Sequence, residues 1–406
     1  MKTSAFCRSA VGVCAAVAML AGCGALRQAQ DDTQSAFNPT ALGASTSAQR
    51  GATGYGFVFS FNRRDGAYPD AGLTGVNGTL YGTTYQGGPN RDGTVFSIGA
   101  GGHEHVVHAF GSSPDGTHPN AGLTNLGGTL YGTTNTGGTN VFGTIFSVTR
   151  DGTERGLYSF KGGSDGAFPN GVTALHGVLY GTTLGGGTNG DGTLFSITAA
   201  GTERLLYRFG GAPDGANPRA SLTAMNGTLY GTTVGGGTNA CGTSGCGTVF
   251  SVASTGTESV LYSFKGGSDG ASPSAGLTVV NGSLYGTTYR GGAHNLGTVF
   301  TITAAGKERV IYSFEGGNDG AQPFARVTDL HGTLYGTTVF GGPSGDGTLF
   351  SITTDGTERV LHAFGGTPDG ANPQADLTAL NGRLYGTTLK GGTHGVGLGT
   401  VFTLTP

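Results

Sequence analysis

The phrase Leu-Tyr-Gly-Thr-Thr occurs seven times in this sequence, and its regular return limits the fold more than any other feature. Successive copies are separated by 50, 49, 50, 55, 50 and 50 residues. A period of this length is typical of repeat architectures, in which each unit buries its apolar surface against its neighbours. The tyrosines of the copies are Tyr81, Tyr131, Tyr180, Tyr230, Tyr285, Tyr335 and Tyr385.

Each unit contains four short apolar runs that have the character of strands. In the last unit they cover 360–364, 376–380, 383–388 and 400–404. Asn381-Gly382 joins the second run to the third, and this dipeptide favours a hairpin because both turn residues adopt positive φ. The runs are apolar on both faces and no helical period accompanies them, so each sheet must be covered by other sheets. The sequence therefore predicts an all-β fold, a seven-bladed β-propeller of four-stranded antiparallel blades.

The two ends of the repeat region predict how the ring closes. The last unit stops one strand short, whereas the region begins with an apolar run at 57–61 that matches the outer strand of the other units. We expect this first strand to pair beside 400–404 in the last blade, which leaves no open edge. The alternative is an open solenoid, which would need capping repeats at its ends. The propeller is predicted over residues 55–406.

The N-terminus has the features of an export signal. Lys2 and Arg8 precede an apolar stretch at 10–22, which ends in Leu-Ala-Gly-Cys at Cys23. This ending resembles the bacterial lipobox, so we expect 1–22 to be a lipoprotein signal peptide and Cys23 to carry the lipid, with an ordinary signal peptide as the alternative. Gly24 in place of Asp favours the outer membrane. The small and polar residues of 23–54 predict a flexible tether that holds the propeller at the membrane.

Several phrases recur in a fixed order and carry a resemblance to a known family. They are NGTLYGTT (77–84), GTVFSI (93–98) and GTER (152–155), with their counterparts over residues 55–406. Together they resemble the GloVer tandem-repeat family of bacterial secreted proteins. The resemblance implies an exported repeat protein with various anchors. It implies no established activity and therefore no catalytic residues.

Composition argues against several kinds of function. Charged residues are 11 % of the chain, the formal net charge is −3, and no long block of one sign occurs, so no nucleic-acid partner is expected. The histidines do not fall at metal-ligand spacing, and neither a metal site nor a cofactor is predicted. GGSDG at 162–166 and 266–270 matches G-x-S-x-G, but other units replace its serine, so no catalytic residue is predicted. We expect a monomer.

Two sequence features concern loops. Cys241 and Cys246 lie in the insertion that lengthens one period to 55 residues, and in an exported protein they predict a local disulfide, with a metal half-site as the weaker alternative.

Every unit also carries Asp-Gly-x-x-Pro, which predicts a turn, although a ring of seven carboxylates around a cation is the alternative. The aspartates are Asp65, Asp115, Asp165, Asp214, Asp269, Asp319 and Asp369.

The glycine-rich loop after each Leu-Tyr-Gly-Thr-Thr phrase varies between units and supplies the candidate ligand-binding residues. Aromatic and arginine side chains among glycines are typical of glycan or protein recognition, although they also occur as ordinary solvated loop residues. These features favour a non-catalytic binding or scaffold module for a polysaccharide or a protein. A polysaccharide lyase or hydrolase acting at the propeller axis is the alternative. The candidates are Tyr85, Arg91, Phe142, Tyr289, Arg290 and Phe340.

Replacement of the predicted lipid-bearing residue tests the export hypothesis. We expect Cys23→Ala to move the protein from the membrane fraction to the soluble fraction, because acylation requires the cysteine sulfur. Fractionation and intact mass measure this. A wild-type protein that is already soluble and has no added lipid mass would contradict the prediction.

Overall fold

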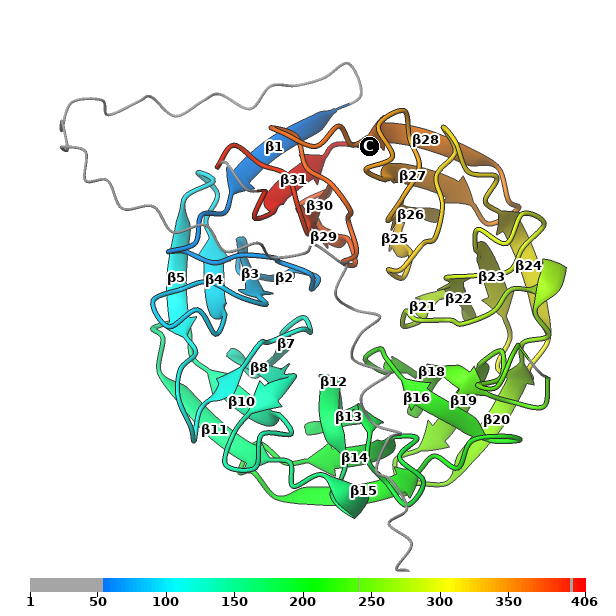
Figure 1. The fold of residues 1–406 in the computed structure, drawn as a ribbon, viewed down its shortest axis with the longest axis horizontal. Coiled ribbons are helices and arrows are strands. Elements are labelled where there is room, and N and C mark those ends of the chain that lie inside the picture. Colours follow the sequence, from blue (N-terminus) through cyan, green and yellow to red (C-terminus); the bar gives the residue numbers. More distant parts are fainter. Residues whose placement is uncertain (1–53, 240, 395–396) are drawn as a thin grey trace, which may run out of the picture. The chain divides into compact units, whose positions relative to one another are not determined.

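The computed structural model describes residues 54–239, 241–394 and 397–406, and it confirms the seven-bladed β-propeller. The sheets surround a common axis (Figure 1). The predicted signal peptide, Cys23 and the tether up to residue 53 lie outside the described residues. Within the described ranges there is no α-helix, and none of the helical segments has the length and apolar character needed to cross a bilayer.

The blades follow one another along the chain. Blade one consists of β2 (Thr74–Val76), β3 (Thr79–Thr84), β4 (Thr94–Ile98) and β5 (Glu104–Ala109). Blade two consists of β7 (Thr124–Leu126), β8 (Thr129–Thr134), β10 (Thr144–Val148) and β11 (Glu154–Ser159). Blade three consists of β12 (Ala167–Leu175), β13 (Val178–Gly185), β14 (Thr193–Ile197) and β15 (Glu203–Arg208). Blades four and five consist of β16 (Gly215–Pro218), β17 (Thr223–Met225), β18 (Thr228–Gly236), β19 (Thr248–Ala253) and β20 (Glu258–Ser263); and β21 (Thr278–Val280), β22 (Ser283–Thr288), β23 (Thr298–Ile302) and β24 (Glu308–Ser313). Blades six and seven consist of β25 (Thr328–Leu330), β26 (Thr333–Thr338), β27 (Thr348–Thr353) and β28 (Glu358–Ala363); and β29 (Thr378–Leu380), β30 (Arg383–Thr388), β31 (Thr400–Leu404) and β1 (Tyr55–Ser60). The pair β6 (Gly116–Thr117) and β9 (Thr136–Gly137) and the 3₁₀ turns Gly163–Asp165 and Gly267–Asp269 lie in loops.

The ring closes as the sequence predicts, through the first strand. β1 lies antiparallel to β31, with Tyr55 opposite Leu404 and Ser60 opposite Thr400 (Figure 1). This strand supplies the outer edge that blade seven otherwise lacks. Because the two ends of the repeat region pair with each other, opening the ring would break a full strand ladder and expose the apolar residues beneath it.

Each residue of the repeated phrase Leu-Tyr-Gly-Thr-Thr has a role in packing. In blade one Leu80 and Tyr81 are buried, and a Cβ added to Gly82 would lie 2.6 Å from Cζ of Phe96. In all seven blades this distance is between 2.4 and 2.6 Å, so the phenylalanine ring occupies the space that a side chain would need. The rings in turn meet the neighbouring blade, as where Phe110 at the end of blade one contacts Phe146 of blade two edge-on at 5.0 Å. The prediction of two apolar faces per sheet is therefore confirmed.

The two threonines of the phrase satisfy polar groups inside the ring. The hydroxyl of Thr84 lies 2.8 Å from that of Thr94 on the next strand, and equivalent buried pairs at 2.8 Å occur in all seven blades. The hydroxyl of Thr83 donates to the carbonyl of Ala121 in the next blade. The bond to the next blade occurs in five blades, whereas the hydroxyls of Thr133 and Thr337 have no partner among the described residues. Buried hydroxyls without partners are costly, so the pairing of the second threonine in every blade explains why the phrase keeps that residue.

A further threonine on each innermost strand joins neighbouring blades. The hydroxyl of Thr74 donates to the carbonyl of Leu123, and that of Thr378 donates to the carbonyl of Leu73, which completes the circle. The other five bonds are Thr124 to Val172, Thr173 to Leu222, Thr223 to Leu277, Thr278 to Val327 and Thr328 to Leu377.

The long loop of blade four contains the predicted disulfide between Cys241 and Cys246. Cys246 is fully buried and packs in the apolar cluster between blades four and five. The bridge therefore fixes an insertion that the repeat itself does not accommodate.

The contact between glycine and phenylalanine can be tested in blade four. A Cβ at position 231 would lie 2.4 Å from Cζ of Phe250, so we expect Gly231→Ala to destabilise the protein by about 1–3 kcal/mol through overpacking. Gly156 on β11 has nothing within 4 Å of the added carbon, and Gly156→Ala is the matched control. Chemical denaturation measures both, and equal midpoints for the two variants would contradict this account of the phrase.

Candidate ligand-binding site at the ring axis

A channel of about 200 Å³ lies among the innermost segments of all seven blades. Its wall contains the residue that follows the proline of each Asp-Gly-x-x-Pro loop. This position differs in chemistry from blade to blade, whereas the residue directly after it is alanine in six blades and glycine in blade three. The seven residues are Asp70, Asn120, Asn170, Arg219, Ser274, Phe324 and Gln374.

The backbone before each of these residues is held in one unusual conformation. The residue preceding the proline has φ between 53° and 60° in every blade, a left-handed conformation that is disfavoured before proline. Its amide donates to a carbonyl of the preceding blade, for example from His118 to Asp92 at 2.8 Å. This kink costs of order 1–3 kcal/mol per residue and is compensated by the bond between blades. The channel residues therefore start from a backbone fixed by two blades. The kinked residues are Tyr68, His118, Phe168, Asn217, Ser272, Gln322 and Asn372.

Two charged side chains of opposite sign give the channel its electrostatic character. Burial raises the pKa of the Asp70 carboxyl to about 7, and its Oδ1 has no hydrogen-bond partner among the described residues. Burial also lowers the pKa of Arg219, although the nearby Tyr289 opposes this effect. No acidic group of the described residues forms an ion pair with Arg219. Both side chains thus retain polar capacity that a ligand can satisfy.

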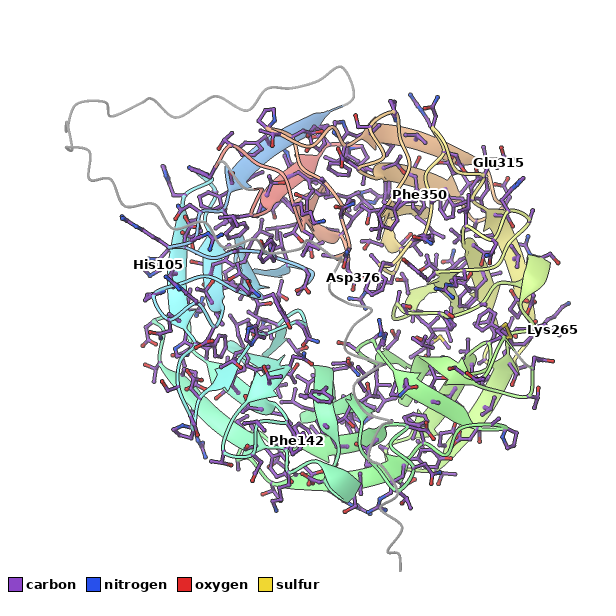
Figure 2. All side chains as sticks on the ribbon, viewed as in Figure 1. His105, Phe142, Lys265, Glu315, Phe350 and Asp376 are labelled. Carbon is purple, nitrogen blue, oxygen red and sulfur yellow. A yellow bond between two sulfur atoms is a disulfide. The ribbon has the colours of Figure 1, made fainter. Side chains whose placement is uncertain are left out.

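An ion pair in the channel wall links two neighbouring blades. Nε of Arg326 lies 2.8 Å from Oδ2 of Asp376, which Figure 2 labels beside the axis. At the equivalent position of other blades stand Gly72, Gly122 and Gly276, where an added Cβ would lie within 3.0 to 3.2 Å of the adjacent segment. Glycine therefore allows the innermost segments to approach closely at this level.

Two of the residues predicted from the sequence lie next to the channel. The ring of Tyr289 contacts Phe324 edge-on at 5.9 Å. The amide of Tyr85 bonds to the carbonyl of Tyr68, two residues before Asp70. Burial raises the pKa of the Tyr85 phenol, and the charge of Asp70 adds to this effect. Both tyrosines are half-buried and lie within reach of the channel side chains.

The other four predicted residues lie in different surroundings. Arg290 and Phe340 form backbone bridges with Ala271 and Ala321, and their side chains are exposed. Arg91 lines a second cavity of about 520 Å³ together with Arg63, Arg64 and Tyr68. Phe142 contacts Phe168 at 6.3 Å and packs against the buried cluster between blades two and three. The structure therefore does not gather the six residues into one site.

The channel residues themselves escaped the sequence analysis. The repeated Asp-Gly-x-x-Pro phrase predicts a turn, and this prediction does not single out the varied residue five positions after the aspartate. The available signal was that variation directly after a proline present in every unit.

Fold and channel together define the class of protein, a seven-bladed β-propeller with an axial pocket lined by one varied residue from each blade. The family model of the Gloeobacter/Verrucomicrobia repeat matches residues 43–244 and 236–402. The chain belongs to this family, as the recurring phrases predicted.

The solved structures to which this chain is similar have little sequence in common with it. The BP39L lectin from Burkholderia pseudomallei is 11 % identical with a TM-score of 0.58, and the match covers 84 % of this chain and 97 % of the lectin. A putative 6-phosphogluconolactonase from Bacteroides uniformis is 13 % identical with a TM-score of 0.49, covering 72 % and 84 %. A gluconolactonase from Xanthomonas campestris is 17 % identical with a TM-score of 0.41, covering 65 % and 79 %. At these identities the likeness concerns the fold alone. The comparison with curated proteins found no match.

The aspartates of the Asp-Gly-x-x-Pro loops are each engaged by their own loop. In blade three the carboxylate of Asp165 accepts the amide of Lys161 at 2.9 Å and the phenol of Tyr158 at 2.8 Å. The same two contacts recur at Asp214, Asp269 and Asp319. The turn hypothesis accounts for these contacts without a shared cation.

Next to most of these aspartates stands a glutamate from the first position of the following outer strand. Burial, and then the negative charge of the neighbouring aspartate, raise the glutamate pKa from the ordinary 4.5 to about 7. One carboxylate oxygen of each is buried with no hydrogen-bond partner among the described residues. These glutamates are Glu104, Glu203, Glu258, Glu308 and Glu358.

These glutamates make stability depend on pH. The folded chain binds their protons more tightly than the unfolded chain between pH 4.5 and about 7, so the stabilisation is complete below 4.5 and is lost as pH rises towards 7. We expect a lower urea midpoint at about pH 8 than at about pH 5. Glu258→Gln should reduce the difference, whereas Glu315→Gln at an exposed position should not (Figure 2). A midpoint that is constant or rises over this interval would contradict the assignment.

Proposed function

We propose that this propeller is a non-catalytic binding module of the bacterial cell envelope, held at the outer membrane by a lipid on Cys23, and that its ligand binds at the axial channel. The lipobox-like sequence at Cys23 and the exported character of the family support the location. The observation that carries the binding site is that seven residues of different chemistry, one from each blade, line a single channel at the axis.

Packing between the blades requires the same residues at certain equivalent positions, and these positions are identical in every blade. The glycine beneath the phenylalanine ring and the paired threonines are identical in all seven units. The residue after the proline occupies an equally fixed backbone position, yet it is acidic, amide, basic, hydroxyl or aromatic in different blades. All seven of these residues line the same channel, so their differing chemistry favours recognition of an asymmetric ligand.

The chemistry of the wall favours a polyhydroxylated, weakly charged ligand, which we propose to be a polysaccharide segment. Asp70 and the amides of Asn120 and Gln374 offer several hydrogen bonds within one small channel. Phe324 with Tyr289 beside it supplies an apolar aromatic surface of the kind against which sugar rings pack. Because the proposed ligand carries little charge, binding should depend little on salt.

An enzyme acting on polysaccharide at the axis is the rival hypothesis. Most glycoside hydrolases use two carboxyl groups on either side of the bond. The acidic residues in the described lining are Asp70 and Asp376, and Asp376 is held by Arg326. Asp70 therefore lacks a second available carboxyl group in this lining, which favours binding over hydrolysis.

Substitutions in the channel test the proposal. After a glycan array identifies a ligand, we expect Arg219→Ala and Tyr289→Ala each to weaken its affinity by about tenfold, which corresponds to about 1.4 kcal/mol. Arg204→Ala removes an exposed arginine from outer strand β15 and should leave affinity unchanged. Isothermal titration at low and high salt measures both the affinity and its salt dependence.

Two results would count against the channel. Full affinity in both channel variants would exclude it as the binding site. A loss confined to Phe340→Ala or Arg290→Ala would place the site on the exposed loops instead. Release of shortened glycan by the wild-type protein would favour the enzymatic rival.

A further inference from the structure

The junction between the outer edges of blades one and two contains a cluster unlike those of the other blades. His108 lies on β5, Asp115 in the loop that leads into blade two, and Glu154 on β11. One ligand atom of each lies within 4.8 Å of the other two. The three side chains are half-buried, so the cluster can exchange ions with solvent.

Comparison with equivalent positions in the same chain shows what is special about this cluster. In four successive units the first position is a tyrosine whose phenol bonds to the aspartate: Tyr158 to Asp165, Tyr207 to Asp214, Tyr262 to Asp269 and Tyr312 to Asp319. Phe59 occupies this position before Asp65. At the ring closure His362 bonds to Asp369, and Tyr55 stands where the other units have glutamate. Among the described residues, only His108, Asp115 and Glu154 therefore combine an imidazole with two carboxylates.

An aromatic contact positions the imidazole of His108 and leaves its Nε2 without a hydrogen bond. The ring of His108 contacts Phe110 edge-on at 4.9 Å, which restricts its rotation. Its Nε2 is buried and has no hydrogen-bond partner among the described residues, and it lies 3.4 Å from Oδ2 of Asp115. The equivalent His362 approaches Asp369 to 2.8 Å, whereas His108 stands farther from Asp115 and leaves a gap. A buried nitrogen lone pair without a partner is costly unless an ion or water occupies that gap.

Asp115 is likewise oriented by its own loop. Its Oδ2 accepts the amide of Gly111 at 2.9 Å, and its Oδ1 accepts the amide of Gly116 at 2.7 Å. Such bonds fix a carboxylate as the outer contacts of metal sites do. Glu154 adds a second carboxylate from the outer strand of blade two, and a cation between the two acids would offset their repulsion.

We propose that His108, Asp115 and Glu154 bind a divalent transition-metal ion, with Zn²⁺ as the best match. One imidazole and two carboxylates are suitable ligands for zinc, and three protein ligands leave a position for water. The ion links the edge of blade one, the loop into blade two and the outer strand of blade two. The site is separate from the axial channel and does not depend on the proposed ligand.

The chain offers a matched variant for the test. His108→Tyr installs the residue that four other units carry at this position, so the fold should tolerate it. The variant should behave like those units, with the phenol bonded to Asp115 and no metal site. His362→Tyr makes the same change at the ring closure, where Tyr55 already donates to Asp369. It should leave metal binding unchanged.

The experiment measures Zn²⁺ binding to the full chain after treatment with a chelator, by isothermal titration and by elemental analysis after dialysis. We expect one tightly bound ion in the wild type and in His362→Tyr, and an affinity lowered by about tenfold or more in His108→Tyr. Glu154→Gln should weaken binding similarly. Co²⁺ should give visible absorption bands in the wild type that are lost in His108→Tyr.

Exposed histidines nearby provide the main alternative source of binding. His105 lies at the outer edge of the ring, and His103 is also exposed (Figure 2). His103→Gln with His105→Gln should keep the affinity of the wild type. The proposal is overturned if this double variant loses the ion, if His108→Tyr binds it as well as the wild type, or if the wild type retains no zinc after dialysis.

Discussion

A closed circle of hydrogen bonds from threonine hydroxyls to carbonyls of the next blade joins the innermost strands, and the rest of the propeller depends on it. The circle is complete because Thr378 of the last blade donates to Leu73 of the first, on the inner side, while β1 pairs with β31 on the outer side. Between these two closures lie the phenylalanine rings that pack each sheet against its neighbour. The same contacts between neighbouring blades must form seven times around one axis, so the residues that make these contacts can vary little. The repeated phrase Leu-Tyr-Gly-Thr-Thr is therefore retained in every unit.

The same constraint explains where variation is tolerated and what it can be used for. Each channel residue follows a kinked backbone that is bonded to the preceding blade, so its side chain can change without altering the path of the chain. Seven rigid positions facing one axis form a site whose chemistry is set by the side chains alone. At the outer edge of the ring, variation between units has a different consequence. His108 stands where four other units have tyrosine, and it supplies the proposed metal ligand without a change in the strands around it.

Most of the fold could be predicted from the sequence because its determinants are local and repeated. Asn-Gly turns, apolar alternation and the missing last strand indicated the hairpins, the two-faced sheets and the closure by β1. The sites depend on contacts across blades, which the order of residues does not reveal. His108 and Glu154 are 46 residues apart, and Arg219 approaches Tyr289 from another blade. Phe142, predicted as a ligand contact, packs against a buried cluster because its loop folds back onto blade three.

The central claim is that identical positions build the ring while the varied axial positions bind the ligand. The most direct measurement is one variant in which Asp70, Asn120, Arg219, Phe324 and Gln374 are all serine, the residue present at Ser274, while Asn170 is kept because its amide bonds to the carbonyl of Pro218. Thermal unfolding and retention on immobilised envelope polysaccharide are measured on the same sample. The account predicts cooperative unfolding close to the wild-type temperature together with loss of retention. An unfolded variant, or one that is retained as strongly as the wild type, would contradict it.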